Sequence, residues 1–409
     1  MEPWRRNLYV TVAMVFVVFL GFAFVLPFIP LYVRELGVTG EQSVALWSGV
    51  IIGIAPLLAG LLAPVWGRWA DRLGAKRMAL RALVAYVILL VLSAYVRTPL
   101  ELLLLRVGIG LTGGIGPLGL AMATSLAPRE QTGRAIGLVQ SAQILSAAVG
   151  PFAGGVLADV IGIRRTFLVT AFVCGIALAV VIWGYRESET GGEAPGQARQ
   201  MSFRDVLTLP RVLPLLLVLF LVNFISRSFT PILPLHLERL GVAADRLAVA
   251  TGGLISIFSV MAALSSALLG GLTRRASPMA LLVASLIGGA AAVLPMAFVP
   301  TFGGFLGLAT LLGFVSGGSL TLCYTIGGLL VPGERRTTAF GFFSGAALFG
   351  GAVSPSVAGL VTHVDLRAIY VLDAALYLLL AGALVLQMRQ ANGSHPGAEA
   401  TESARNNRG

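Results

Sequence analysis

Residues 8–33 read LYVTVAMVFVVFLGFAFVLPFIPLYV, an apolar run without a charged side chain. A helix needs about 20 mostly apolar residues to cross roughly 30 Å of hydrocarbon, where each unpaired backbone group costs several kcal/mol. The run is too long for the core of a signal peptide, and no small-residue cleavage site follows a short apolar core. We therefore predict an uncleaved first membrane-spanning helix over this stretch.

The rest of the chain is similarly apolar. Of 409 residues, 57% are hydrophobic and 11% are charged, and the mean hydropathy is +0.89, whereas a soluble domain carries about 25% charged residues. The net charge of +11 would suggest nucleic-acid binding in a soluble protein, but here the basic residues are divided among the loops. The composition predicts an all-α integral membrane protein embedded in the lipid bilayer, with no nucleic-acid partner.

Hydropathy and turn signals divide the chain into twelve transmembrane helices. The predicted helices are 8–33, 43–66, 78–97, 100–127, 135–158, 165–184, 211–237, 247–270, 279–299, 303–331, 338–363 and 367–388. With the N-terminus inside, 20 of the 29 Lys and Arg residues fall on the inner side and seven on the outer side. This excess predicts a multi-pass protein of the cell membrane with both termini in the cytoplasm.

The two halves of the chain repeat at one offset of 204 residues. The offset carries Pro27 onto Pro231, Leu36 onto Leu240, Pro128 onto Pro332, Pro151 onto Pro355 and Gly155 onto Gly359. A single register without a gap indicates a duplicated six-helix unit. We predict an N-terminal bundle over 1–185, a cytoplasmic linker over 186–210, a C-terminal bundle over 211–388 and a disordered tail over 389–409. Two halves of equal orientation would enclose a cavity between them.

The segment after the second predicted helix, residues 67–77, reads GRWADRLGAKR. It resembles the loop motif of the major facilitator superfamily, Gly-x-x-x-Asp-Arg-x-Gly-Arg-Lys, at every position but Ala75. In that family the loop belongs to the conformational gate, so the resemblance implies that role for Gly67, Asp71, Arg72, Gly74 and Arg77. A positive-inside anchor would explain the arginines, but not the embedded acid or the two glycines. The second half has Arg275 where the offset predicts the acid, so its gate is weak or absent.

Two further segments resemble the family. Residues 146–155, SAAVGPFAGG, resemble the Gly-Pro-x-x-Gly-Gly motif of its antiporter branch through Gly150, Pro151, Gly154 and Gly155, although small residues also serve close helix packing. Residues 21–30, GFAFVLPFIP, resemble the Gly and paired-Pro pattern of bacterial twelve-helix drug:proton antiporters. Through the repeat the resemblance covers nearly the whole chain. It implies the major facilitator fold and export of small lipophilic or cationic compounds by proton antiport with alternating access.

Ionisable residues inside a membrane are costly and are candidates for function. Arg106, followed by Gly110, matches the family's Arg-x-x-x-Gly motif, whose arginine is linked to proton coupling, although Ile109 replaces the usual glutamine. Arg227 lies one turn from Asn223 on a helix that lines the cavity in this fold. For Arg227 two interpretations stay open: it contacts the cargo, or Asp373 neutralises it and both are structural.

The predicted substrate cavity is broad and apolar, with few polar contacts, as expected for loosely selective binding. Its candidate lining residues are Phe24, Gln140, Gln143, Asn223 and Arg227. The first helix contains no acid, so no carboxylate for proton coupling is obvious from the sequence.

Nothing in the sequence indicates an enzyme, a cofactor or a metal site. No Gly-x-x-x-x-Gly-Lys loop is present, and neither the histidines nor Cys174 and Cys323 have metal-ligand spacing. The first hypothesis is therefore a monomeric secondary exporter of multidrug type. One alternative is a transporter of the same fold with a narrow cargo such as a sugar, a metabolite or a lipid. The other is a non-transporting membrane scaffold or sensor.

Overall fold

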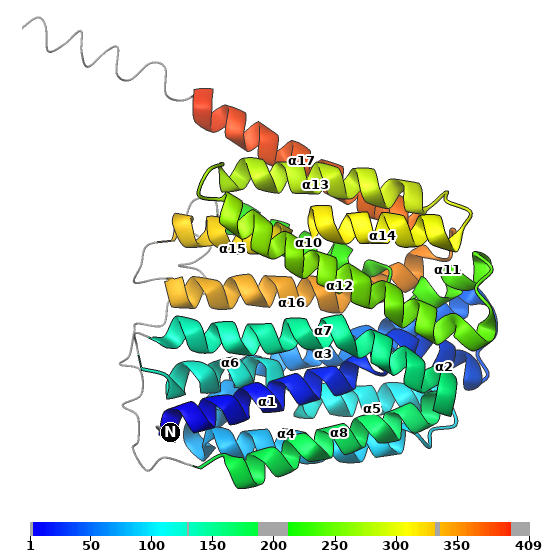
Figure 1. The fold of residues 1–409 in the computed structure, drawn as a ribbon, viewed down its shortest axis with the longest axis vertical. Coiled ribbons are helices and arrows are strands. Elements are labelled where there is room, and N and C mark those ends of the chain that lie inside the picture. Colours follow the sequence, from blue (N-terminus) through cyan, green and yellow to red (C-terminus); the bar gives the residue numbers. More distant parts are fainter. Residues whose placement is uncertain (1–2, 129–130, 187–211, 332–335, 394–409) are drawn as a thin grey trace, which may run out of the picture.

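The computed structural model describes residues 3–128, 131–186, 212–331 and 336–393, and within these ranges all regular structure is helical. The first half contains α1 (Pro3–Ala23), η1 (Leu26–Phe28), α2 (Ile29–Glu35), α3 (Glu41–Leu73), α4 (Ala75–Ser93), α5 (Pro99–Thr112), α6 (Ile115–Leu126), α7 (Thr132–Ile161) and α8 (Ile163–Gly184). The second contains α10 (Val212–Ser228), α11 (Leu233–Arg239), η3 (Ala244–Arg246), α12 (Leu247–Leu272), α13 (Pro278–Met296), α14 (Phe302–Ser316), α15 (Ser319–Leu330), α16 (Arg336–Val361) and α17 (Ala368–Gly393). Figure 1 shows the long helices running side by side.

Among the described residues, ten helical spans are long and apolar enough to cross a membrane, or eleven if α10 and α11, bent by 44°, form one span. The predicted helix over 78–97 is α4, whose first two turns carry Lys76, Arg77 and Arg81. Each of the twelve predicted helices therefore has a counterpart in the structure, and the molecule is a multi-pass membrane protein.

Four predicted helices are not continuous, and they are the first and fourth of each half: 8–33, 100–127, 211–237 and 303–331. The first breaks at Pro27, which cannot donate a backbone hydrogen bond. The second breaks at Gly114, whose φ of 113° is a left-handed conformation that glycine adopts without a steric penalty. At the first break the irregular backbone lies inside the bundle, since Pro27 and Phe28 are buried.

The segment predicted as a gate loop is almost entirely helical. α3 continues to Leu73 and α4 begins at Ala75, so Gly74, with a φ of 90°, makes the turn alone. Hydropathy ended the predicted helix at residue 66, but polar residues continue a helix well once it has left the hydrocarbon. For the same reason α17 continues to Gly393, into the predicted tail. Residues 187–211 and 394–409, which hold most of the predicted linker and tail, lie outside the described residues.

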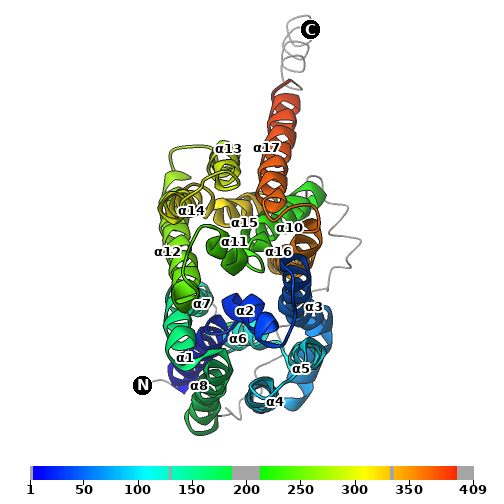
Figure 2. The ribbon, with the colours of Figure 1, turned by 90° about the vertical axis from the view of Figure 1, so that its right-hand side faces the viewer.

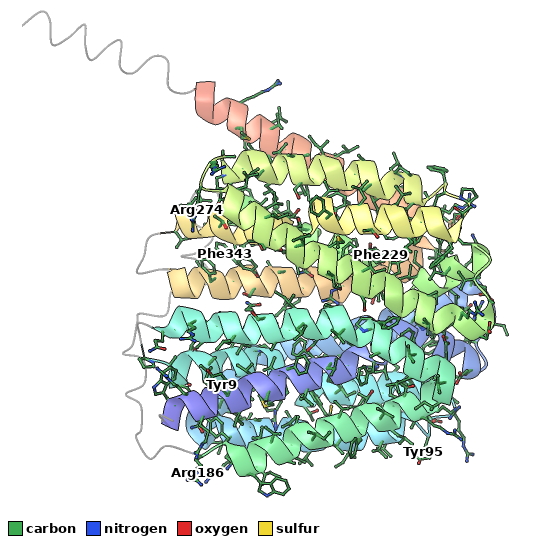
Figure 3. The ribbon with its side chains drawn as sticks, in the orientation of Figure 1. Tyr9, Tyr95, Arg186, Phe229, Arg274 and Phe343 are labelled. Atoms are coloured by element: carbon green, nitrogen blue, oxygen red, sulfur yellow. The ribbon has the colours of Figure 1, made fainter. Side chains whose placement is uncertain are left out.

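Figure 2, which looks along the helices, shows α1–α8 gathered in one half of the molecule and α10–α17 in the other. The halves meet along two helix pairs, α7 with α12 and α3 with α16. The 204-residue offset carries α3 onto α12 and α7 onto α16, so one contact occurs twice. Figure 3 labels Tyr95 and Arg186 at opposite ends of the bundle. We call these the Tyr95 end and the Arg186 end.

Candidate functional site

The small residues of the antiporter-like motif in α7 lie against the break in the first helix. A Cβ added to Gly150 would overlap the Cβ of Ala23, and one added to Gly154 would overlap the backbone of Phe24. The Phe24 side chain is itself buried, with 7% of its surface exposed. Phe24 thus helps to pack α1 against α7. It was predicted to line the substrate cavity, but its side chain does not stand on an open cavity wall.

An adjacent face of the same motif packs on the second half. A Cβ on Gly155 would lie 2.5 Å from the carbonyl oxygen of Ala248 on α12, and one on Gly252 would overlap the carbonyl group of Pro151. The repeat reproduces this seam between α16 and α3, where a Cβ on Gly359 would lie 2.7 Å from the carbonyl oxygen of Ala45. Backbone therefore touches backbone across both seams, closer than any larger residue would permit.

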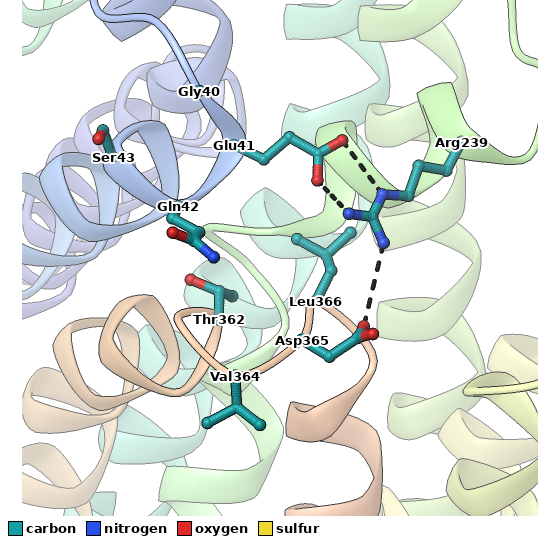
Figure 4. A pocket seen from close by; sticks show the side chains of 9 residues that line it. All are labelled: Gly40, Glu41, Gln42, Ser43, Arg239, Thr362, Val364, Asp365 and Leu366. Carbon is teal, nitrogen blue, oxygen red and sulfur yellow. Dashed lines mark hydrogen bonds and ion pairs between the residues drawn. The ribbon is translucent and has the colours of Figure 1, made fainter.

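Ion pairs also join the halves at the Tyr95 end. Arg34 on α2 pairs with Glu238 on α11 at 2.7 Å, and Arg239 on α11 pairs with Glu41 at the start of α3. Figure 4 shows Arg239 between Glu41 and Asp365, whose carboxylate lies 3.9 Å away. A cavity of about 360 Å³ opens beside these residues. The 204-residue offset places Glu238 at the position equivalent to Arg34, so the repeat supplies both partners of the first pair.

Asp159 makes a further contact that the sequence analysis missed. It lies one turn beyond Gly155 on α7, and its Oδ2 accepts a hydrogen bond of 2.8 Å from the backbone N–H of Val249. α12 begins at Leu247, so the first half caps the N-terminus of a helix in the second half, where unpaired N–H groups favour a negative charge. The sequence did contain a signal for this contact. Asp159 follows the motif residue Gly155 by four positions, and that spacing puts both on one face of a helix.

The Arg186 end has no comparable seam in the described residues. A Cβ on Gly137 of α7, Gly60 of α3 or Gly341 of α16 would meet nothing within 4 Å. On α7, Gln140 is exposed and Gln143 is half-buried. In the described residues, the close backbone contacts and the ion pairs that join the halves thus lie toward the Tyr95 end.

Arg227 and Asn223 of α10 both lie against Gly351 of α16. A Cβ on that glycine would stand 2.7 Å from Asn223 Oδ1 and 3.5 Å from Arg227 Cγ. Arg227 is exposed and forms no described ion pair with Asp373, whose Oδ2 is hydrogen-bonded to Ser228. The interpretation in which Asp373 neutralises Arg227 is therefore wrong: consecutive residues of a helix point about 100° apart, and the acid faces Ser228.

Arg106 is buried inside the first half, with 1% of its surface exposed. Its guanidinium carbon lies 6.0 Å from the ring centre of Phe167 on α8, and its Nε and Nη2 have no hydrogen-bond partner. The side chain faces α8 and not the second half. A buried cation with so little compensation is costly, which argues for a role other than stability.

The structure describes part of the predicted gate segment. The surroundings of Gly67 and the side chain of Asp71 lie outside the described part, while the side chains of Arg72 and Arg77 are exposed. Lys76 donates a hydrogen bond of 2.6 Å to the carbonyl oxygen of Tyr185, which ties the α3–α4 turn to the end of α8. Of the motif residues, Pro151 and Gly155 lie in the seam with α12, and Gly150 and Gly154 pack against the first helix. Arg106 and the predicted gate segment lie apart from this seam.

Comparisons with known proteins cover nearly the whole chain. A family model described as Major Facilitator Superfamily matches residues 11–307 and 250–407. Multidrug resistance protein MdtG of Dickeya zeae (strain Ech586) is 32% identical over 392 residues, which are 95% of each chain. MdtG of Salmonella heidelberg (strain SL476) is 33% identical over 384 residues, 92% of this chain and 93% of the relative.

Solved structures share the fold at lower identity. A bacterial homolog of the human lysosomal transporter Spinster, in an inward-facing and occupied conformation, superposes with a TM-score of 0.77 at 17% identity, covering 95% of this chain and 98% of that one. The human organic anion transporter MFSD10 gives a TM-score of 0.67 at 18% identity, covering 94% and 100%. These likenesses concern the arrangement of the helices.

Proposed function

Because the chain belongs to the Major Facilitator Superfamily, we propose that it is a secondary active exporter of small lipophilic or cationic compounds. The single observation that carries this function is an identity of 32–33% to multidrug resistance proteins over more than nine-tenths of the chain. The Gly-rich seam on α7 supports it, because two halves that touch through backbone can pivot without repacking large side chains.

The protein lies in the bacterial cytoplasmic membrane as a monomer, with the Arg186 end and both termini in the cytoplasm. The excess of Lys and Arg at that end supports this orientation. The conformation described here is then closed toward the outside and open toward the cytoplasm, from which an exporter takes its cargo. The cargo would enter between Gln140 and Gln143 of α7 and Asn223 and Arg227 of α10.

Export requires the alternate state, in which the Arg186 end closes and the Tyr95 end opens. The contacts at Asp159, Arg34 and Arg239 would break, and the segment from Gly67 to Arg77 would hold the closed Arg186 end as the gate. Proton entry drives the cycle, and Arg106 belongs to the coupling machinery because its buried charge responds to any nearby change of protonation.

Everted membrane vesicles test the function directly. In such vesicles export becomes uptake, so ethidium should accumulate when the vesicle interior is acidified and should leave when an uncoupler removes the gradient. Asp71→Asn and Arg106→Ala should each lower the initial rate. Arg246→Ala, which removes an exposed charge on η3, serves as the control and should transport like wild type.

If well-folded protein in the vesicles transports neither ethidium nor any other lipophilic cation, the result contradicts multidrug export. It would then favour a transporter with a narrow cargo. Ethidium transport that does not depend on the pH gradient would contradict proton antiport but not multidrug export. A chain that transports nothing, with a cellular phenotype unchanged by Asp71→Asn, would favour the scaffold or sensor.

A further inference from the structure

A buried polar cluster lies inside the second half, away from both seams. It consists of Ser228 at the end of α10, His236 of α11, and Tyr370 and Asp373 of α17. At most 2% of the surface of any of the four is exposed. Several of their polar atoms have no hydrogen-bond partner: both ring nitrogens of His236, the Tyr370 hydroxyl and Oδ1 of Asp373. Unsatisfied polar groups at this depth are rare in native structures and call for an explanation.

In the part of the chain that the structure describes, the carboxyl group of Asp373 has no cation to balance a charge. Among the described residues no ion pair reaches it, and Arg227 of α10 lies against α16 instead. The other titratable groups around it are His236 from α11 and Tyr370 and Tyr377 from α17. α13, α14 and the described side chains of α16 contribute none. An unpaired carboxylate in such surroundings costs several kcal/mol, so the cluster suits the neutral acid.

The hydrogen bonds of Ser228 fit a proton on Asp373. The Ser228 hydroxyl lies 2.5 Å from Oδ2 of Asp373 and 2.9 Å from the carbonyl oxygen of Ile225. A hydroxyl has one hydrogen to donate and can also accept. If Asp373 is protonated, it donates to Ser228 and Ser228 donates to Ile225, so both bonds form. If Asp373 is ionised, Ser228 must turn its hydrogen to the carboxylate and leave Ile225.

The position of the cluster gives it access to the transport movement. Ser228 is the last residue of α10, next to the break at residues 229–232, and its neighbour Arg227 is exposed. α10 packs on α16, which forms the seam with α3 of the first half. A rocking movement of the halves therefore acts on the helix that carries both the predicted cargo residues and Ser228.

We propose that Asp373 is the group that binds and releases the coupled proton. Water that reaches the break beside Ser228 accepts the proton, which leaves a carboxylate on Asp373, and the Ser228 hydroxyl then turns from Ile225 to stabilise the charge. Rebinding of a proton reverses both steps. The inference rests on the proposed proton antiport and names the carboxyl group that the first helix lacks.

Purified protein in liposomes separates the proton site from the rest of the cycle. Two activities of ethidium are measured: transport driven by a pH gradient, and exchange of labelled for unlabelled cargo at equal pH, which needs no net proton movement. Asp373→Asn keeps the size of the side chain and a hydrogen bond to Ser228. It should lower gradient-driven transport at least tenfold and leave exchange unchanged. Glu101→Gln, which changes an exposed acid of α5, should keep both activities.

Each outcome of the liposome experiment either supports or overturns the role of Asp373. Gradient-driven transport that survives in Asp373→Asn overturns the inference but not proton antiport, and loss of both activities assigns Asp373 to the structure alone. A wild type that exchanges cargo but ignores the gradient overturns proton antiport and the inference with it. If Asp373→Asn does not fold, Ser228→Ala tests the inference instead. A hydrogen bond to a charged group is stronger than one to a neutral group, so the loss of the Ser228 hydroxyl disfavours the carboxylate of Asp373. The pH profile of gradient-driven transport should therefore move to higher pH. An unchanged profile overturns the inference.

Discussion

Asp159 of the first half caps α12 of the second half through a hydrogen bond of 2.8 Å to the backbone N–H of Val249. The residue stands one turn beyond Gly155, whose missing side chain lets the two helices approach. The glycine and the acid act together, because the close approach is what brings the carboxylate within reach of the helix N-terminus. This relationship makes Asp159 one of the ionisable groups that hold the Tyr95 end closed, beside the ion pairs of Arg34 and Arg239.

Asp159→Ala should shift the molecule toward opening at the Tyr95 end. Removing an N-cap acceptor costs about 1 kcal/mol, which is about a fivefold change in population. Asp159→Asn should shift it less, since asparagine also caps helices. Spin labels at the exposed positions Val160 and Val364, one in each half, report the distance across that end. Glu101→Ala, which removes an exposed acid of α5, is the control. An unchanged distance distribution in Asp159→Ala would show that this hydrogen bond does not hold the Tyr95 end closed.

Gly155→Ala should destabilise the closed seam while the protein still folds. The added Cβ would lie 2.5 Å from the carbonyl oxygen of Ala248, and backbone cannot move aside as a flexible side chain can. Overpacking of this kind costs about 1–3 kcal/mol, so we expect about a tenfold lower rate of ethidium transport. Gly137→Ala on the same helix meets nothing within 4 Å and should keep the wild-type rate. Equal rates in the two variants would show that the seam does not need its glycine.

The pair of Arg34 and Glu238 should show a measurable coupling between the halves. Arg34→Glu or Glu238→Arg alone places like charges on the two sides of this contact in the closed state, and the double exchange restores attraction. The Arg34 and Glu238 side chains are 35% and 42% exposed, so water weakens their attraction and the coupling energy should be only about 0.2–1 kcal/mol. High salt should reduce it further. The Val160–Val364 distance in a double-mutant cycle measures it, and additive single effects would argue against the pair.

Arg106→Met should raise thermal stability and lose gradient-driven transport. The arginine is buried with two nitrogens unpaired, so an apolar side chain of similar length removes a desolvation cost. If Arg106 served only packing, the same variant would retain transport. Thermal unfolding in detergent and the vesicle assay, on one preparation, distinguish the two roles. Ile109→Val, a buried neighbour on the same helix, controls for the effect of any substitution there.

The sequence predicted the number and order of the helices because burial in hydrocarbon is a local requirement. An apolar run such as residues 8–33 must satisfy its own backbone wherever it lies, so hydropathy alone identifies it. The repeat was equally accessible, since Pro151 and Pro355 are related by one offset along the chain. The interruptions at Pro27 and Gly114 were not predicted, because the apolar runs 8–33 and 100–127 continue through both positions and hydropathy does not report backbone geometry.

Sequence by itself therefore determined that this is a twelve-helix chain built of two similar halves, with small residues on α7 and unusual charges at Arg106, Arg227 and Asp373. Only the tertiary structure decided what those residues meet. It placed Gly155 on Ala248, set Asp159 at the start of α12, and separated Asp373 from Arg227 in favour of Ser228. These contacts join residues far apart in the chain, and their geometry depends on how whole helices are rotated and docked, which no local pattern encodes.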